Sequence, residues 1–362
     1  MKIMVFNVPA ESGGALTILE NFYDEVKHSK EDVEWIFVLS TPEFKETKNI
    51  KVLNYKWIKK NWVFRLFFDY FVAPKIVKEN SPDKIFSLQN VSIPRTNIKQ
   101  TIYVHQPLPF TKVKFKFNKN PKLWIYQNVI AKSIYRSIKK ADKVIVQMNW
   151  FAEECEKKVK GSIKKIKVLP PKVFIEKSII EGINYKPDHE KLTTNFFFPA
   201  GSYVYKNHEV IVKACEELKS RGITDYSVMF TLNGNENTQI SKLMKKKENL
   251  NLPIQFIGNL SKKDVYQEYL NSILVFPSFI ETFGLPLLEM RILNGKIIAS
   301  DTNFSREILE NYNSAEYFQY DDFIGLADLM QKYISSSYEN TSYEKVLDDY
   351  ISNSDLVTHV IY

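Results

Sequence analysis

The chain has 362 residues, of which 44% are hydrophobic, 25% charged and 14% aromatic, with a formal net charge of +8. This composition excludes a low-complexity chain and is typical of a globular protein long enough for two domains. Its two cysteines, Cys155 and Cys215, lie in separate helix-like segments. They predict neither a disulfide framework nor a zinc site, so a reducing compartment is the simpler interpretation.

The first ten residues, MKIMVFNVPA, predict a buried first strand and are too short for a signal peptide. No uninterrupted apolar run reaches about 18 residues, so we expect no membrane-spanning helix. The richest apolar segment, NWVFRLFFDYFVAPKI, is interrupted by Arg65 and Asp69.

Ten short β-branched and aromatic runs predict strands. In chain order they are KIMVFNV, VEWIFVL, DKIFSL, TIYVH and KVIVQ, then NFFFPA, YSVMFTL, PIQFIG, ILVFPS and KIIAS. Helical periodicity fills the gaps between them, for example at 15–28, 123–140, 207–221 and 261–271. Strands that are apolar throughout and alternate with helices predict parallel sheets covered on both faces.

The polar segment EGINYKPDHEKLTTN, residues 181–195, separates the two series of runs and predicts an interdomain linker. The expected fold class is α/β, with two doubly wound Rossmann-like domains at residues 1–180 and 195–362, facing each other across a cleft. Ligands of such sheets bind at the carboxyl ends of the strands. Functional motifs should therefore lie just after strands.

The segment FPSFIETFGLPLLEM, residues 276–290, holds two glutamates, Glu281 and Glu289, around a Gly-Leu-Pro step. Pro286 suits the start of a helix because its missing N–H would be unpaired there, so we predict a helix from Leu285 or Pro286 with Glu289 in its first turn. Gly284 lets backbone amides approach a ligand, and a helix N-terminus can hold a diphosphate.

Glutamates cannot bind that diphosphate, but they can accept hydrogen bonds from hydroxyls on either side of it. The pattern therefore suits a ligand with a sugar, a diphosphate and a ribose. The alternative is that both glutamates are helix-N-terminal acids stabilised by the macrodipole.

The segment ETFGLPLLE resembles the E-x7-E element of family-four glycosyltransferases, which are retaining GT-B enzymes that use nucleotide-diphosphate sugars. ESGGALTIL resembles the family's N-terminal glycine loop, and GSYVYKNHEVIVKAC resembles its lysine segment. FIGNLSKKDVYQEY resembles the Gly-containing loop near the base. YVHQPLPF and ADKVIVQMNW resemble first-domain segments of bacterial O-antigen and capsule members. The resemblance covers nearly the whole chain.

The resemblance implies a role for each matching residue. Glu281 would bind hydroxyls of the donor sugar, Glu289 would hold the ribose, and Lys206 would neutralise the departing diphosphate. The glycines would let the first domain approach the donor, and His105 would contact the donor sugar near the reacting centre. The implied catalytic residues are His105, Lys206 and Glu281, and the implied donor-binding residues are Gly13, Gly14, Lys206, Asn259, Glu281, Thr282, Phe283, Gly284, Leu285 and Glu289.

Each role has a structural alternative. Gly13 and Gly14 could form a plain strand-to-helix turn, His105 could be a satisfied structural group, and Lys206 could be a solvated lysine beside the N-cap candidate Asn207.

The chain also departs from the family, whose members often carry an arginine a few residues before the lysine; here the segment reads GSYVY. Either Lys206 acts with the helix N-terminus alone, or another basic residue such as Arg291 or Lys262 contributes. No Asp-x-Asp element follows an apolar strand, and YDD at 320–322 fits a helix cap better. We therefore predict metal-independent chemistry without a cofactor.

Positive charge is concentrated between Thr111 and Lys172, where 17 Lys and Arg against 4 Asp and Glu give a net charge of +13. Such a window predicts an anionic partner. Its stretch TKVKFKFNKNPKLW interleaves lysines with Phe and Trp, which suits an anionic membrane surface. The alternative is a solvated basic helix face with the aromatic side chains in the core.

Taken with these features, the resemblance implies a retaining transferase that moves a hexose-type sugar from a nucleotide-diphosphate donor to a growing, lipid-linked bacterial surface glycan (O-antigen or capsule, with lipopolysaccharide biosynthesis as the wider setting). It would be cytoplasmic and peripheral on the inner face of the inner membrane, and would not bind nucleic acid. Two alternatives stay open. One is a GT-B sugar-nucleotide epimerase; the other is a nucleic-acid-binding protein, which the charge supports but no recognised binding motif does.

Overall fold

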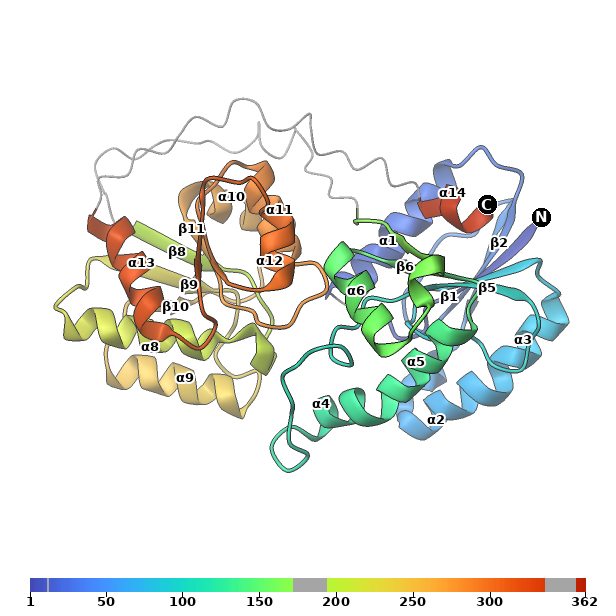
Figure 1. The fold of residues 1–362 in the computed structure, drawn as a ribbon, viewed down its shortest axis with the longest axis horizontal. Coiled ribbons are helices and arrows are strands. Elements are labelled where there is room, and N and C mark those ends of the chain that lie inside the picture. Colours follow the sequence, from blue (N-terminus) through green and yellow to red (C-terminus); the bar gives the residue numbers. More distant parts are fainter. Residues whose placement is uncertain (12, 172–193, 336–355) are drawn as a thin grey trace. The chain divides into compact units, whose positions relative to one another are not determined.

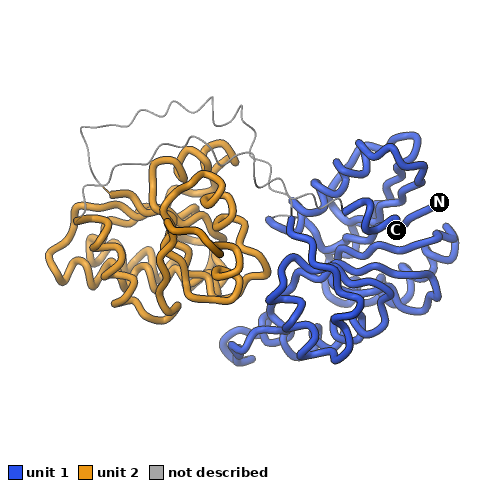
Figure 2. Tube along the Cα trace, turned by 45° about the horizontal axis from the view of Figure 1, so that its top comes forward, with its two compact units in different colours: residues 1–172, 352–362 blue, residues 173–351 orange. Residues whose placement is uncertain are grey.

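The computed structural model describes residues 1–11, 13–171, 194–335 and 356–362. The chain forms two compact units, one of residues 1–172 and 352–362 and the other of residues 173–351 (Figure 2). The predicted linker at 181–195 falls almost entirely outside the described residues.

The first unit is built on a seven-stranded sheet with the order β3-β2-β1-β4-β5-β6-β7, and all neighbouring strands are parallel. Its strands are β1 Lys2–Phe6, β2 Glu34–Leu39, β3 Ile50–Asn54, β4 Lys84–Ser87, β5 Lys99–Tyr103, β6 Lys143–Val146 and β7 Ile166–Val168. Its α-helices are α1 Gly13–His28, α2 Trp62–Phe67, α3 Ala73–Asn80, α4 Pro121–Ile125, α5 Ala131–Lys140, α6 Asn149–Lys158 and α14 Leu356–Ile361. Two short π-helical segments, η2 Phe68–Val72 and η3 Tyr126–Ile130, join α2 to α3 and α4 to α5, and the 3-10 segments are η1 Lys56–Lys60 and η4 Ser162–Lys165.

Alternate residues of the interior strand β1 explain why its sequence is apolar from Ile3 to Phe6. Ile3 and Val5 belong to a hydrophobic cluster with residues of α1, whereas Met4 and Phe6 belong to a second cluster with residues of α3. Figure 1 shows α1 and α14 together on one side of the sheet and α3 on the other. Burial on both faces leaves no position between Ile3 and Phe6 for a polar side chain.

The second unit is built on a six-stranded parallel sheet with the order β10-β9-β8-β11-β12-β13. Its strands are β8 Thr194–Phe198, β9 Tyr226–Phe230, β10 Ile254–Phe256, β11 Ile273–Phe276, β12 Ile297–Ser300 and β13 Ala315–Phe318. Its helices are α8 His208–Ser220, α9 Thr238–Asn249, α10 Lys262–Asn271, α11 Leu285–Ile292, α12 Asn303–Ile308 and α13 Phe323–Ser335, with the 3-10 turn η5 Val204–Lys206 before α8. In Figure 1, α8 and α9 cover one face and α10, α11 and α12 the other.

Both sheets confirm the predicted doubly wound α/β class. In each, the strand order reverses direction once, between β1 and β4 in the first sheet and between β8 and β11 in the second. The loops that leave the carboxyl ends of two such strands turn to opposite faces and leave a crevice between them, which is where ligands of open α/β sheets bind. In the second sheet the expected ligand crevice therefore lies between the loops after β8 and β11.

All ten predicted strands are present, and three further strands are not predicted by the sequence. These three, β3, β7 and β13, are edge strands with partly exposed side chains. The side chains of these three strands are covered less completely than those of a central strand, so their sequences lack the continuous apolar run that identifies the others. The fourth edge strand, β10, is nevertheless predicted from PIQFIG.

The predicted second domain, 195–362, is wrong at its C-terminal end, because α14 packs on the first unit. Val357, Val360 and Ile361 are buried in the same hydrophobic cluster as α1. The Lys143 ammonium donates to the His359 carbonyl at 2.9 Å, and the Glu25 carboxylate accepts from the Leu356 N–H at 3.1 Å. The apolar side chains of α14 thus become part of the hydrophobic cluster of the first unit.

Both cysteines are free and buried, Cys155 in the first unit and Cys215 in the second. Among the described residues, no helix combines the length and hydropathy needed to cross a membrane.

Candidate active site

Lys206 and Glu281 meet at the point where the second sheet reverses direction. Lys206 ends the short turn η5 after β8, and Glu281 lies in the loop after β11. The Lys206 ammonium forms an ion pair and a hydrogen bond with the Glu281 carboxylate, and their side chains are only 19% and 16% exposed. The same ammonium lies 6.0 Å from the centre of the Phe276 ring. The structure thus joins two of the residues predicted to act on the donor.

Asn207 fastens the two loops together. Its side-chain amide donates to the Pro277 carbonyl at 3.3 Å and to the Tyr320 carbonyl at 2.6 Å. The Phe279 N–H donates to the Tyr205 carbonyl at 3.1 Å. Asn207 occupies the N-cap position of α8, as expected, but its side chain makes no capping bond. Instead it holds the loop after β8 against the loop after β11, which fixes the backbone on both sides of the ion pair.

The helix α11 begins at Leu285, with Pro286 at its start, as the sequence predicts. Gly284 precedes it with φ of 92°, a left-handed conformation that glycine adopts without strain. The prediction that Glu289 lies in the first turn is wrong, because the fifth helical residue is beyond one turn of 3.6 residues. Neither glutamate is therefore a first-turn acid, which removes the basis of the macrodipole alternative.

Glu289 is held by two tyrosine hydroxyls from α10. The Tyr269 hydroxyl donates to one carboxylate oxygen at 3.0 Å, and the Tyr266 hydroxyl lies 3.4 Å from the other. Burial raises the pKa of Glu289, while the hydrogen bonds from Tyr269 and Tyr266 and the charge of Lys262 act in the opposite direction. Burial and the neighbouring carboxylate also raise the pKa of both tyrosines, which keeps them protonated as donors. A carboxylate has about four lone-pair sites, so it can accept further hydroxyl donors here.

The two basic residues considered as substitutes for the family's arginine lie in different surroundings. The Arg291 guanidinium donates to the carbonyl of Ile308 and sits 5.9 Å from the centre of the Tyr312 ring. Lys262 begins α10, its ammonium lies 5.8 Å from the centre of the Tyr266 ring, and its charge acts to lower the pKa of Glu289. Of the two, Lys262 is therefore the cation that belongs to the glutamate's surroundings.

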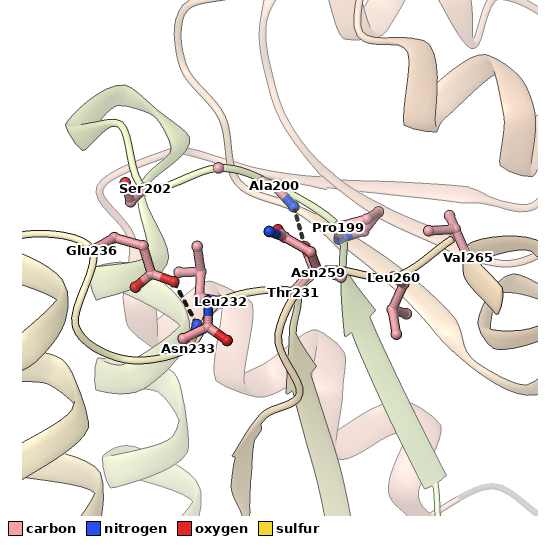
Figure 3. Close-up of a pocket in the computed structure, with 11 residues that line it drawn as sticks. Pro199, Ala200, Ser202, Thr231, Leu232, Asn233, Glu236, Asn259, Leu260 and Val265 are labelled. Atoms are coloured by element: carbon pink, nitrogen blue, oxygen red, sulfur yellow. Dashed lines mark hydrogen bonds between the residues drawn. The ribbon is translucent and has the colours of Figure 1, made fainter. Parts of the chain in front are cut away.

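A pocket of about 350 Å³ opens at the carboxyl ends of β8, β9 and β10 (Figure 3). Polar groups of three loops line it beside apolar side chains, and of the predicted donor-binding residues it contains only Asn259. Its floor is fixed by hydrogen bonds from the Ala200 N–H to the Thr231 hydroxyl at 3.1 Å and from the Gly234 N–H to the Glu236 carboxylate at 3.1 Å. Val265 of α10 also lines the pocket and is adjacent in sequence to Tyr266, so α10 contributes both to this pocket and to the surroundings of Glu289.

The other predicted residues belong to the first unit. His105 follows β5, and its backbone N–H donates to the Asn90 side-chain oxygen at 2.7 Å. Desolvation lowers the pKa of His105 to about 4, so its imidazole is neutral near pH 7. Gly13 begins α1 with φ of 61°, and the positions where Gly13 and Gly14 would carry a Cβ are open. These three residues lie at the carboxyl edge of the first sheet, as the motif predicts.

Asp322 acts as a helix cap, as expected, because its carboxylate accepts from the Gly325 N–H at 2.9 Å. In the part of the chain that the structure describes, no three His, Cys, Asp or Glu side chains gather as a metal site would require. Metal independence stays a prediction.

Sequence reasoning missed the groups that support the predicted site. They are Asn207 as a clamp, Tyr266 and Tyr269 as donors to Glu289, and Thr231 and Asn233 at the pocket. The pocket residues follow the β9 strand, so the rule that sites lie after strands indicates them; nothing in the sequence marks the two tyrosines, which face inward from the middle of a helix.

Comparison with known proteins defines the class. The structure is similar to sucrose-phosphate synthase from Thermosynechococcus elongatus, with a TM-score of 0.67 and 13% identity over 91% of this chain and 89% of that one. It is also similar to the lipopolysaccharide outer core galactosyltransferase WaaB, with a TM-score of 0.67 and 16% identity over 100% and 99% of the two chains. Anabaena HepE in complex with UDP-glucose matches with a TM-score of 0.63 and 13% identity over 92% and 90%. The two units therefore form a GT-B fold.

The family described as Glycosyl transferases group 1 matches residues 184–352. This part of the chain, which carries Lys206, Glu281 and Glu289, is therefore similar in sequence to that family. No curated protein matches the sequence.

A buried histidine beside the site predicts acid sensitivity. His208 is 3% exposed, and its ring centre lies 4.8 Å from that of Phe198 and 5.0 Å from that of Phe230. Burial, aided by the charge of Lys206, lowers the pKa of His208 from 6.5 to about 3. Below about pH 6.5 the His208 imidazole is protonated in the unfolded chain but stays neutral in the folded chain. The free energy of unfolding therefore falls as the pH decreases from about 6.5 toward 3.

We expect His208→Phe to reduce this loss. At about pH 4.5 the contribution of His208 is on the order of 2–3 kcal/mol, because one pH unit corresponds to about 1.4 kcal/mol. Thermal melts at pH 7 and pH 4.5 should therefore diverge less for the variant than for the wild type, whereas the exposed His28→Phe should follow the wild type. Equal acid sensitivity of His208→Phe and the wild type would mean that His208 is protonated in the folded state.

Proposed function

We propose that the protein is a retaining glycosyltransferase that moves a hexose-type sugar from a nucleotide-diphosphate donor to a growing, lipid-linked bacterial surface glycan, of the O-antigen or capsule kind. The observation that carries this proposal is the pairing of Lys206 with Glu281 at the switch point of the second sheet, next to the start of α11. A cation, a carboxylate and a helix N-terminus at one such position suit a sugar linked to a diphosphate.

The donor would lie along the loops of the second unit. The pocket around Asn259 combines apolar walls with two side-chain amides, two hydroxyls and the Glu236 carboxylate, which fits a planar base with a hydrogen-bonding edge. Glu289, whose carboxylate also accepts from Tyr269 of α10, would accept hydrogen bonds from the ribose hydroxyls. The backbone amides of residues 282–285 would hold the diphosphate, and Glu281 would bind the sugar hydroxyls.

The transition state of glycosyl transfer has an oxocarbenium-like sugar and a departing diphosphate. The Lys206 ammonium and the amides before α11 would stabilise the charge that develops on that leaving group, which is the kind of preorganised electrostatic effect that contributes most in such sites. For a retaining enzyme, the departing phosphate would accept the acceptor's proton, so no protein base need be placed on the back face of the sugar. The neutral imidazole of His105 would contact the donor sugar as a hydrogen-bonding group rather than as a cation.

Two of the similar structures suggest where to begin. Anabaena HepE is recorded with UDP-glucose, and WaaB is described as a lipopolysaccharide galactosyltransferase. UDP-hexoses are therefore the first donors to try, and glycans of the bacterial surface are the first acceptors.

A donor screen tests the proposal. We expect one family of UDP-, GDP- or dTDP-sugars to raise the melting temperature, and the same donor to be consumed only when a lipid-linked glycan acceptor is added. Activity should survive excess EDTA, because Lys206 and the helix amides take the place of a metal. Strict dependence on added Mn²⁺ or Mg²⁺ would contradict this phosphate site, and conversion of the donor sugar without an acceptor would instead indicate an epimerase.

We further propose that the protein associates with the inner face of the inner membrane through its lysine segment. Five lysines, Lys112, Lys114, Lys116, Lys119 and Lys122, are exposed, whereas Val113 and Phe115 between them are partly buried. Gln127 anchors the segment, accepting from the Phe115 N–H at 3.0 Å and donating to the Val113 carbonyl at 2.7 Å. The five lysine side chains are therefore open to solvent, as attraction to anionic lipid requires.

A further inference from the structure

The helical run from Trp62 to Val72 turns an apolar face to solvent and its charged side chains toward the protein. Its outward face consists of large apolar side chains that are between 40% and 73% exposed: Trp62, Val63, Leu66, Phe67, Tyr70 and Phe71. These positions recur at intervals of four, so they form one stripe along the helix. A helix on a soluble surface normally turns such a stripe to the core.

The charged residues of the run face the protein instead. The Arg65 guanidinium donates to the Asp69 carboxylate at 2.7 Å and to the side-chain oxygen of Gln89 at 3.2 Å, and Gln89 is 5% exposed. The side chains of Arg65 and Asp69 are only about a fifth exposed, at 19% and 20%. Two charges are thus held inward by partners while six apolar groups are held outward, so the outward stripe is built into the local structure.

We propose that this stripe, named here the Trp62–Phe71 face, inserts into the interfacial layer of an anionic lipid bilayer, with the helix lying in the plane of the membrane. The inference adds a specific binding element to the proposed membrane association. It rests on that proposal only in naming the inner face of the inner membrane as the surface that is bound. In this arrangement the Trp62–Phe71 face supplies the apolar part of the membrane affinity, and the lysine segment supplies the electrostatic part. An interfacial helix of this kind buries its apolar face by about 5–10 Å at the boundary of headgroups and acyl chains.

The charges around the Trp62–Phe71 face select a lipid bilayer as its partner. Trp62 packs against Tyr126 with ring centres 6.3 Å apart, which joins the face to the helix that follows the lysine segment. The exposed Arg95 lies 5.0 Å from the centre of the Phe71 ring, and the exposed Lys60 precedes the run. From residue 84 to residue 141 the chain has twelve Lys and Arg and no Asp or Glu. Aromatic side chains bordered by cations are the composition that the interface of an anionic membrane favours.

The test separates electrostatic attraction from apolar insertion by measuring vesicle binding at low and at high salt. Wild type should co-sediment with vesicles of phosphatidylethanolamine and phosphatidylglycerol at low salt. At about 1 M salt, where the Debye length is about 3 Å, part of the binding should persist because apolar insertion is not screened. Changing the five lysines of the lysine segment to glutamine should remove the salt-sensitive part and leave the persistent part.

The variant V63S/L66S/F71S should lose the persistent part, with an affinity for these vesicles lower by about tenfold or more, since interfacial binding scales with the apolar area buried. The matched control I163S/L250S/I324S changes side chains that are 47%, 38% and 49% exposed elsewhere, and should bind as the wild type does. Both variants should keep the wild-type melting temperature and, if the proposed function holds, transfer to a short water-soluble acceptor. Quenching of tryptophan fluorescence by brominated acyl chains should fall in Trp62→Phe.

Three results would overturn the inference: full release of the wild type at high salt, unchanged vesicle binding by V63S/L66S/F71S, or self-association of the wild type that this variant abolishes without altering vesicle binding. The last would assign the face to a second copy of the chain. None of these results depends on transferase activity, so loss of the proposed function and loss of this inference are distinguishable.

Discussion

Lys206→Ala should reduce turnover by about 100-fold or more, the usual effect of removing one group that stabilises developing charge. The ammonium lies at the junction of the loops after β8 and β11, where Asn207 holds the surrounding backbone in place. Its loss also leaves the Glu281 carboxylate, which is 16% exposed, without its cation. Both effects raise the barrier: the leaving group loses a counter-charge, and Glu281 is freed to repel the diphosphate.

The measurement is steady-state kinetics with the best donor of the screen, separated into kcat and KM. Stabilisation of the departing phosphate predicts a fall in kcat, whereas simple neutralisation of the bound diphosphate predicts a rise in KM alone. Lys213→Ala is the matched control, since Lys213 pairs with Glu209 on the exposed face of α8 at 2.8 Å. Wild-type kcat in Lys206→Ala would make Lys206 a structural partner of Glu281 and no more.

Glu289→Gln should weaken binding of the nucleoside diphosphate by about 10- to 100-fold, because a hydrogen bond to a charged acceptor contributes about 1.5–3 kcal/mol. The carboxylate can accept from both α10 tyrosines and from a ribose, whereas the amide presents only one acceptor oxygen. Isothermal titration with nucleoside diphosphate measures the effect without need of an acceptor.

The same substitution should leave the fold at least as stable as before. Burial raises the pKa of Glu289, which means that the folded state disfavours its ionised form above that pKa and gains stability as the pH falls through it. A neutral glutamine avoids this cost. Glu209→Gln, on the exposed face of α8, should change neither binding nor stability. Unchanged nucleotide affinity in Glu289→Gln would assign Glu289 to packing against Tyr266 and Tyr269.

The sequence predicts well what is decided locally. Central strands carry continuous apolar runs because both of their faces are buried, and the start of α11 follows from a glycine and a proline whose backbone preferences are intrinsic. The pairing of Lys206 with Glu281 follows once both are placed after neighbouring strands.

What the sequence does not predict depends on contacts between distant segments. Edge strands such as β13 lack an apolar signature, and the donors to Glu289 come from a helix about twenty residues earlier. Asparagine is a residue type that favours the N-cap position, yet the Asn207 side chain donates to carbonyls 70 and 113 residues away in the sequence. The outward stripe of Trp62–Val72 is invisible for a related reason: periodicity shows that a helix has an apolar face but not which way that face turns.

The packing of α14 on the first unit affects how the chain can fold during synthesis. Translation delivers the first unit's seven strands, then the whole second unit, and only afterwards the residues Leu356–Ile361 that complete the first unit's hydrophobic cluster. Domains generally fold in the order in which they leave the ribosome. Here the contiguous second unit can reach its final packing while the first still lacks the α14 side chains that pack in the cluster with α1. We expect a fragment that ends near residue 172 to leave those apolar side chains without the cover that α14 supplies.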